Sequence, residues 1–171
     1  MPASSPTNAH SERTSMKQPH ATIAEFFVPG KPAPQGSKRH VGRGILVESS
    51  REVGPWRERI ALAAHAAMSQ AGLGHPIDKR ALAVDLGFVM PRPASTPKRS
   101  TPPAIRRPDS DKLARAVLDA LTHIVFTDDS AVVDLRARKR LAERDEIPGV
   151  HISVRVISAG PGEKRETGDH S

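Results

Sequence analysis

Apolar side chains recur at every second position in parts of the chain, which is typical of a β-strand with one buried face. The pattern is clearest within residues 80–90, where the alternating positions are Leu82, Val84, Leu86, Phe88 and Met90. Residues 21–28 and 150–158 are also rich in β-branched and apolar side chains, so we predict a strand in each.

Residues 131–142 form a fourth predicted strand with two unlike faces. One side carries Val133, Leu135 and Ala137. The other side carries Asp134, Arg136, Arg138 and Arg140. The alternation therefore predicts one apolar and one charged face for this strand.

Two other stretches repeat their apolar positions with the spacing of a helix. The first begins near Gly54 and Pro55 and ends at Gly72 and Gly74, residues that suit helix termini. Its apolar positions are Trp56, Ile60, Ala63, Ala64, Ala67 and Ala71. The alanines would allow close packing against a sheet or a second subunit, and we interpret the tryptophan as a core residue.

The second predicted helix follows Pro108, with Asp109 in the position of an N-cap. Its apolar face consists of Leu113, Ala116, Val117, Ala120, Leu121 and Ile124. Along the chain, the predicted elements run strand, helix, strand, helix, strand, strand. This order predicts an α+β fold, with a small mixed β-sheet flanked by helices.

The remaining segments lack an apolar period. Residues 29–44 are rich in glycine, proline and basic residues and are predicted as a flexible loop, followed by a short strand at residues 45–47. Residues 91–108 are predicted as a long basic loop, which in a compact domain is usually functional or disordered. The polar residues 1–20 and 159–171 are predicted as disordered tails, which leaves one domain over residues 21–158.

The net charge points to a polyanionic partner. The chain of 171 residues has a formal charge of +7. The two predicted tails are neutral together, so the whole excess lies in the predicted domain. A basic protein whose charge only aids solubility is the alternative. With four Phe, one Trp and no Tyr there is little to stack unpaired bases on, which favours duplex or branched DNA held through its phosphates.

The lack of cysteine and the lack of a long apolar run exclude several kinds of site and segment. Without cysteine there can be no disulfide, no thiolate zinc site and no thiol nucleophile. No apolar run reaches the roughly 18 residues of a membrane span, and residues 1–20 do not resemble a secretory signal. We therefore expect a soluble protein of the cytoplasm, associated with the nucleoid if it binds DNA.

Five aspartates gather within residues 106–129 of this basic chain. Asp109 and Asp111 fall at a predicted helix start, where a carboxylate can also serve simply to cap the helix and complement its dipole. Asp111, Arg115 and Asp119 form a polar stripe, whose simplest interpretation is a surface ladder of ion pairs. Asp128 and Asp129 follow the helix.

A metal site would account for the aspartates. If the strand after the helix packs beside it, the turn could bring Asp128 or Asp129 back near the helix start. Three carboxylates with only oxygen ligands suit Mg²⁺ or Mn²⁺. Such an ion would reverse the local charge and allow a phosphodiester to approach and be attacked.

The segment RPDSDKLARAVLDALTHIVFTDDSAVVDLRARKR resembles the metal-binding core of the RusA family of Holliday junction resolvases. The family pattern is D-x-D-N-x-x-K, then D-A-L-T, then a D-D pair before a strand. Asp109, Asp111 and Asp129 match its three catalytic aspartates, with Asp128 beside the third, and D-A-L-T is intact from Asp119.

The resemblance implies a homodimeric, Mg²⁺-dependent endodeoxyribonuclease in which Mn²⁺ can substitute. Such an enzyme resolves four-way DNA junctions by paired symmetric nicks during recombination and repair. The chain departs from the family pattern at Arg115, which replaces a lysine, and at Lys112, which replaces an asparagine. The arginine keeps a positive charge but cannot donate its proton as a general acid. The turn before the D-D pair is also one residue shorter.

The candidate DNA-binding cations come from the two basic loops. They are Lys31, Lys38, Arg39, Arg43, Arg92, Lys98, Arg99, Arg106 and Arg107. Any one of them alone is more simply a solvated surface charge. Two other functions stay open: a branched-DNA-binding protein of the same fold without catalysis, and a D-x-D glycosyltransferase, although the chain is short for the latter.

Overall fold

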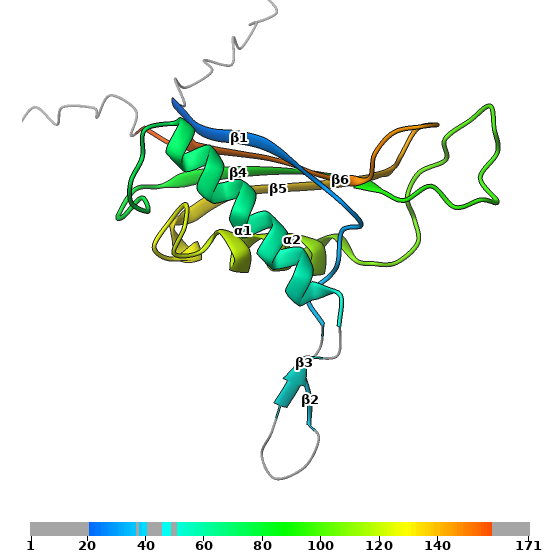
Figure 1. Ribbon diagram of the computed structural model, residues 1–171, viewed down its shortest axis with the longest axis horizontal. Helices are drawn as coiled ribbons and strands as arrows, with labels where there is room; N and C mark the ends of the chain where they lie inside the picture. The colour runs from blue at the N-terminus through cyan, green and yellow to red at the C-terminus, as the bar shows by residue number, and fades with distance from the viewer. Residues whose placement is uncertain (1–20, 37, 41–45, 49–50, 159–171) are drawn as a thin grey trace, which may run out of the picture.

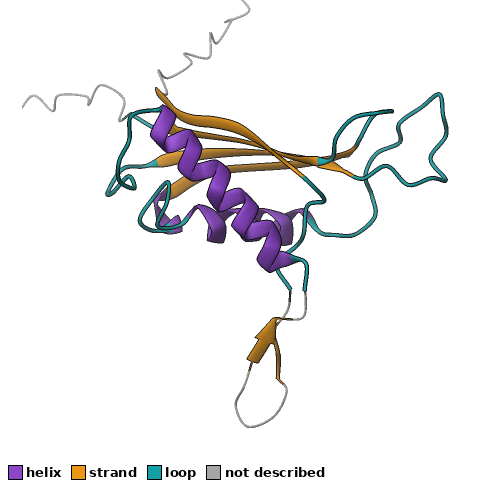
Figure 2. Ribbon diagram, in the orientation of Figure 1, coloured by secondary structure: helices purple, strands orange, loops and turns teal. Residues whose placement is uncertain are grey.

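The fold is a four-stranded mixed sheet with both helices on one of its faces (Figures 1 and 2). The computed structural model describes residues 21–36, 38–40, 46–48 and 51–158. The strands are β1 (Ala21–Pro29), β2 (Lys38–His40), β3 (Leu46–Glu48), β4 (Leu82–Met90), β5 (Val132–Leu141) and β6 (Gly149–Val156). The helices are α1 (Val53–Gln70), α2 (Ser110–Leu121) and the short 3-10 helix η1 (Asp129–Ala131). The predicted α+β architecture is confirmed.

The strand order in the main sheet is β1-β6-β4-β5. β6 pairs antiparallel with both β1 and β4, whereas β4 and β5 are parallel and are connected through α2. Ala21 pairs with Val156, so the first and last strands of the domain begin and end side by side. The two chain directions within one sheet make it the mixed sheet that the order of elements predicted.

The core lies between the sheet and the two helices. The five alternating residues of β4 are all buried, as predicted, and so are Ala83 and Val89 on the opposite side of the strand. α1 contributes Trp56, Ile60, Ala64 and Met68, which confirms the tryptophan as a core residue. Ala71, placed on the apolar face by its spacing, is exposed because α1 ends at Gln70.

β5 is an edge strand, and this explains its exposed apolar residues. Val133 and Leu135, predicted on its apolar side, are 64% and 44% exposed. Ala137 and Leu141 lie on the same side as Leu135 and pack against the core. The register with β4 is irregular at the start of β5, so Val133 is out of step with that ladder.

The segment before α1 is more ordered than the predicted flexible loop in the part that is described. Pro32 and Ala33 are buried, and the Gln35 backbone N–H donates to the Lys112 carbonyl at 2.9 Å. β2 and β3 form a small antiparallel hairpin, and β3 lies one residue after the predicted strand at 45–47. The predicted tails and Arg43 lie outside the described residues.

Candidate functional site

The first turn of α2 presents two free carboxylates. Asp109 occupies the N-cap position, as predicted, but its side chain makes no capping hydrogen bond, and Asp111 follows in the first turn. Both residues are exposed, and neither carboxylate has a hydrogen-bond or ion-pair partner among the described residues. The start of α2 therefore does not depend on hydrogen bonds from these two carboxylates, which remain available to a ligand.

Lys139 holds the backbone directly before Asp109. Its ammonium donates to the carbonyls of Arg106, at 2.9 Å, and Pro108, at 2.8 Å. Lys139 lies near the end of β5 on the same side as Ala137 and Leu141. Sequence reasoning missed this residue, although a lysine on the otherwise apolar side of a strand was the signal that could have found it.

An open hollow of about 550 Å³ lies beside Asp111. It is lined by Gln35, Gly36, Asp111, Lys112, Arg115 and Asp119. Four of the predicted site residues therefore share one surface. Arg115 is exposed and forms no ion pair within the described part of the chain, so its guanidinium is free to meet a phosphate.

Asp119 has a different role from the one its spacing indicated. Its carboxylate accepts a hydrogen bond from Arg57 of α1, which also donates to Gln35. The expected ladder through Arg115 is therefore wrong, and the partner of Asp119 comes from another helix. Both members of the pair are about two-thirds covered, so the pair fastens α1 to α2 and shapes one wall of the hollow.

Asp128 and Asp129 lie at the opposite end of α2. The chain leaves the helix at Thr122, turns, and enters η1 and β5 there, as Figure 1 shows. The helix has 12 residues, which at about 1.5 Å per residue is about 18 Å. The expectation that the turn returns these aspartates to the helix start is wrong. Asp128 and Asp129 precede β5 in the chain, and it is β5 that runs back beside α2.

Asp128 is already engaged at this end. It accepts a hydrogen bond from the Ser130 backbone N–H at 2.8 Å as the N-cap of η1. Hydrogen bonds from Ser130, through its side chain first and its backbone second, lower the pKa of Asp128 from its ordinary value. Asp129 is exposed. Among the described residues, no three acidic or histidine side chains come close enough together to hold a metal ion.

Comparison with known proteins decides the family. The family described as endodeoxyribonuclease RusA matches residues 29–155. The chain belongs to the RusA family. It is also 28% identical over 144 residues to an uncharacterized protein, YqaN, of Bacillus subtilis (strain 168), a match that covers 79% of this chain and 97% of that protein. Neither helix of the described RusA domain is long and apolar enough to cross a membrane.

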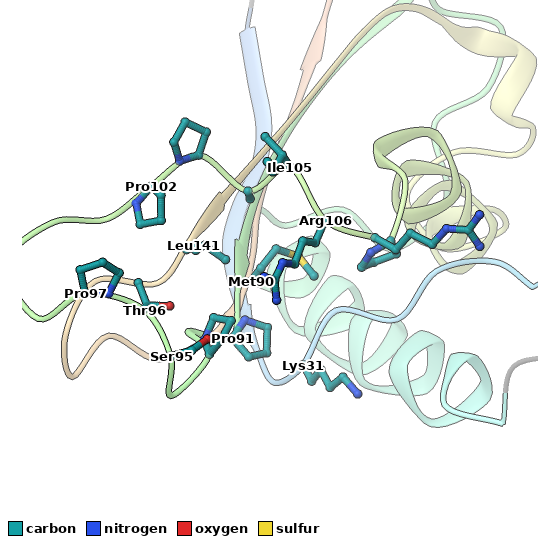
Figure 3. A pocket seen from close by; sticks show the side chains of 15 residues that line it. Lys31, Met90, Pro91, Ser95, Thr96, Pro97, Pro102, Ile105, Arg106 and Leu141 are labelled. Atoms are coloured by element: carbon teal, nitrogen blue, oxygen red, sulfur yellow. The ribbon is translucent and has the colours of Figure 1, made fainter.

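The RusA domain carries a second hollow, of about 500 Å³, beneath the loop 91–108 (Figure 3). Figure 3 shows loop prolines and Arg106 gathered around the ends of β4 and β5, at Met90 and Leu141. Lys31 and Arg107 also line it. The surface is thus apolar at its base and cationic at its margin, close to Asp109.

The predicted DNA-binding cations differ in whether their side chains are exposed and whether they already form an ion pair. Lys98, Arg99, Arg106 and Arg107 are exposed. Lys31 forms an ion pair with Glu52 at 3.1 Å. Because both side chains lie on an open surface, this pair is weak and the Lys31 ammonium can exchange it for another partner. The side chains of Lys38 and Arg39 and the whole of Arg43 lie outside the described part.

Arg92 is a structural residue of the RusA domain rather than a free cation. Its guanidinium donates to the Pro97, Ser100 and Ala142 carbonyls at 2.6 to 3.1 Å and to the Thr101 hydroxyl at 2.7 Å. Thr101 in turn donates to Glu143 at 2.5 Å. The loop 91–108 is therefore fastened to the turn between β5 and β6, so the exposed cations stand on a defined support.

Proposed function

We propose that this protein is a structure-selective endodeoxyribonuclease that resolves four-way DNA junctions by paired nicks, in recombination or repair. The supporting observation is a RusA domain whose α2 helix starts with two exposed carboxylates without partners, Asp109 and Asp111. The exposed cations of the loop 91–108 lead directly into this helix. A basic surface can hold the DNA arms while the carboxylates face the strand to be cut.

The donor chemistry of the site suits Mg²⁺, with Mn²⁺ able to substitute, because carboxylates are hard oxygen ligands. A bound divalent cation would offset the repulsion between the aspartates and a phosphodiester. A single chain brings only two of the predicted ligands together at each end of α2. The full set of three is therefore not gathered within one chain.

Arg115 is proposed to stabilise charge at the phosphate. It lines the hollow with Asp111, and its guanidinium stays protonated at any usable pH. The proton for the leaving oxygen would then come from water or another group. This assignment separates the protein from relatives that have a lysine at this position.

The test uses a labelled synthetic four-way junction, with linear duplex and single strands as controls, in EDTA, Mg²⁺ or Mn²⁺. We expect paired symmetric nicks only with a metal ion and only in the junction. Asp111→Asn should abolish nicking and preserve binding, because it removes a ligand and some repulsion. Retained nicking in that variant would remove Asp111 from the site.

A second function is a branched-DNA-binding protein without catalysis. The departures at Arg115 and Lys112 favour it, since both change the first turns of α2. It requires tight junction binding and no nicking in either metal ion. In that case Arg115→Lys is the first variant to test for restored cleavage.

A further inference from the structure

The hollow beneath the loop 91–108 adjoins Asp109 but is separate from the hollow beside Asp111. Its volume of about 500 Å³ lies in the range of pockets that bind small ligands. Arg107 and Pro108 line it, and Asp109 follows them directly in the chain. We propose that this hollow binds one nucleotide of the strand to be cut, extruded from the base stack at the crossover. The inference rests on the proposed function for the source of that nucleotide.

The walls of the hollow are apolar and can cover the two faces of a base. Met90, Leu141 and Ile105 line it, and Figure 3 shows Ile105 and Pro102 on one side of the space and Pro91 on the other. The prolines that line it are Pro91, Pro93, Pro97, Pro102, Pro103 and Pro108. Covering a base with these side chains removes apolar surface from water, which favours binding.

The polar groups of the hollow match the remaining parts of a nucleotide. Ser95 and Thr96 line it with hydroxyls that form no hydrogen bond to other described residues, so they can meet the edge of a base. Lys31, Arg106 and Arg107 can hold its phosphate, and none of the described lining residues is acidic. An acidic peptide would suit the cations and the apolar walls equally well. The position beside Asp109, where a DNA strand has to pass, favours the nucleotide.

Both ends of the loop are fixed, so the hollow exists before any ligand enters. Lys139 donates to the carbonyls of Arg106 and Pro108 at 2.9 and 2.8 Å. Near the other end, Arg92 donates to two loop carbonyls and to the Ala142 carbonyl at 3.1 Å. A preformed hollow loses little conformational entropy on binding. The bonds of Lys139 also fix the distance between the hollow and Asp109.

A four-way junction makes such a nucleotide accessible. Each strand that crosses between arms leaves one base stack and enters another, so a base at the crossover is stacked less completely than a base in continuous duplex. The free-energy cost of extruding a base is lowest where pairing or stacking is already impaired. The hollow would therefore favour a junction over a continuous duplex.

Fluorescence of 2-aminopurine tests the capture directly, because this base is quenched when stacked in DNA and bright when extruded. It is placed in turn at each position flanking the crossover of a synthetic junction, in EDTA so that no strand is cut. We expect wild-type protein to raise the fluorescence severalfold at one position, since none of the described residues that line the hollow is an aromatic quencher. A continuous duplex with the same base should show no rise.

Ile105→Glu is the variant that blocks the hollow. Ile105 is 89% exposed, so the change is compatible with folding, but it removes an apolar wall and adds a carboxylate where the phosphate would lie. We expect the fluorescence rise to be lost at protein concentrations that saturate the junction. An unchanged rise in this variant would overturn the proposal and make an acidic peptide the remaining occupant of the hollow.

Ile147→Glu is the matched control. Ile147 is 63% exposed on the turn between β5 and β6 and is not among the residues that line the hollow. The substitution changes the net charge by the same amount as Ile105→Glu, and it should retain the fluorescence rise. Equal losses in the two variants would overturn the capture, because they would trace the effect to net charge alone.

Nicking rates separate this inference from the proposed function. A mismatch opposite the captured base removes its pairing, so we expect the single-turnover rate of wild type to rise about tenfold, and that of Ile105→Glu to stay unchanged. A wild type that nicks the junction without any fluorescence rise would overturn the capture and leave the nuclease function standing. A rise that Ile105→Glu abolishes, in a protein that nicks nothing, would support the capture and contradict the nuclease function.

Competition with dTMP distinguishes DNA from free nucleotides as the source of the ligand. We expect dTMP, at a concentration equal to that of the junction, to leave the fluorescence rise unchanged, because a nucleotide within DNA is also held through its neighbours. Loss of the rise under these conditions would overturn capture from DNA and assign the hollow to free nucleotides.

Discussion

At the scale of single residues, Lys139 fastens the backbone that precedes Asp109, and we predict that this contact positions Asp109. Lys139→Met removes the donor for two backbone carbonyls, and a hydrogen bond to a charged group contributes about 1.5–3 kcal/mol. We expect the single-turnover nicking rate to fall about tenfold or more, since about 1.4 kcal/mol corresponds to a factor of ten. Junction affinity should change little, because the lysine is turned inward to the backbone.

The conservative and distant variants separate positioning from general damage. Lys139→Arg retains a donor and should restore most of the rate. Lys98→Met removes an exposed loop cation and should weaken binding without lowering the rate at saturating protein. An unchanged rate in folded Lys139→Met would show that the segment before Asp109 does not need this anchor.

Glu146 makes stability depend on pH in a defined window. Hydrogen bonds from the Arg140 guanidinium and then from the Glu143 backbone N–H lower the pKa of Glu146 from 4.5 to about 2. The stabilisation is therefore complete above about pH 4.5 and is lost as the pH falls toward 2. Because the pair is partly exposed, we expect it to contribute less than about 1 kcal/mol.

The measurement compares urea unfolding of wild type and Glu146→Gln across that pH range. The difference in unfolding free energy between the two proteins should shrink as the pH is lowered from 4.5 to about 2. A difference that stays constant with pH would mean that Glu146 stabilises the turn without its charge.

At the scale of elements, Arg57 and Asp119 tie the two helices together. Arg57→Met leaves the Asp119 carboxylate half-buried without its partner, so we expect a loss of about 1–3 kcal/mol in the free energy of unfolding. The double variant Arg57→Met, Asp119→Asn should lose less than the two single variants added together. Additive losses would mean that the pair contributes nothing beyond its separate contacts.

Periodicity predicted the elements because burial imposes it. The sides of β4 and the apolar face of α2 are set by which residues meet the core, and that information is local in the chain. Whether Asp129 lies near Asp109 depends instead on the length of α2 and the course of the turn, which no local pattern contains. The same holds for Asp119, whose partner Arg57 comes from a helix distant in the sequence.

Composition also failed to sort the basic residues by role. Arg92 and Arg106 both lie in one proline-rich basic loop, and nothing in the sequence distinguishes them. The Arg92 guanidinium is engaged in hydrogen bonds that hold the loop. The Arg106 side chain is instead exposed, at the margin of the hollow beneath the loop. Composition alone did not separate Lys139 from the three arginines of its own strand either. Only its position on the other, apolar side of the strand distinguished it.

At the scale of the whole molecule, the basic surface should govern DNA affinity through salt. Each phosphate contact contributes about 0.9 to the slope of log affinity against log salt concentration. We expect Arg106→Ala and Arg107→Ala each to lower that slope by about this amount for junction DNA. Arg80, exposed just before β4 at the opposite end of the sheet, provides the control, and Arg80→Ala should leave the slope unchanged.

The pairing of Ala21 with Val156 has a consequence for how the chain could be rearranged. Since the first and last strands of the domain meet at one end of the sheet, a short linker could join them without disturbing the ladder. New termini could then be opened at the exposed tip of the loop 91–108, near Lys98. Such a circular permutant would carry its free ends beside the basic surface, where a reporter attached to either end would sense the arrival of DNA.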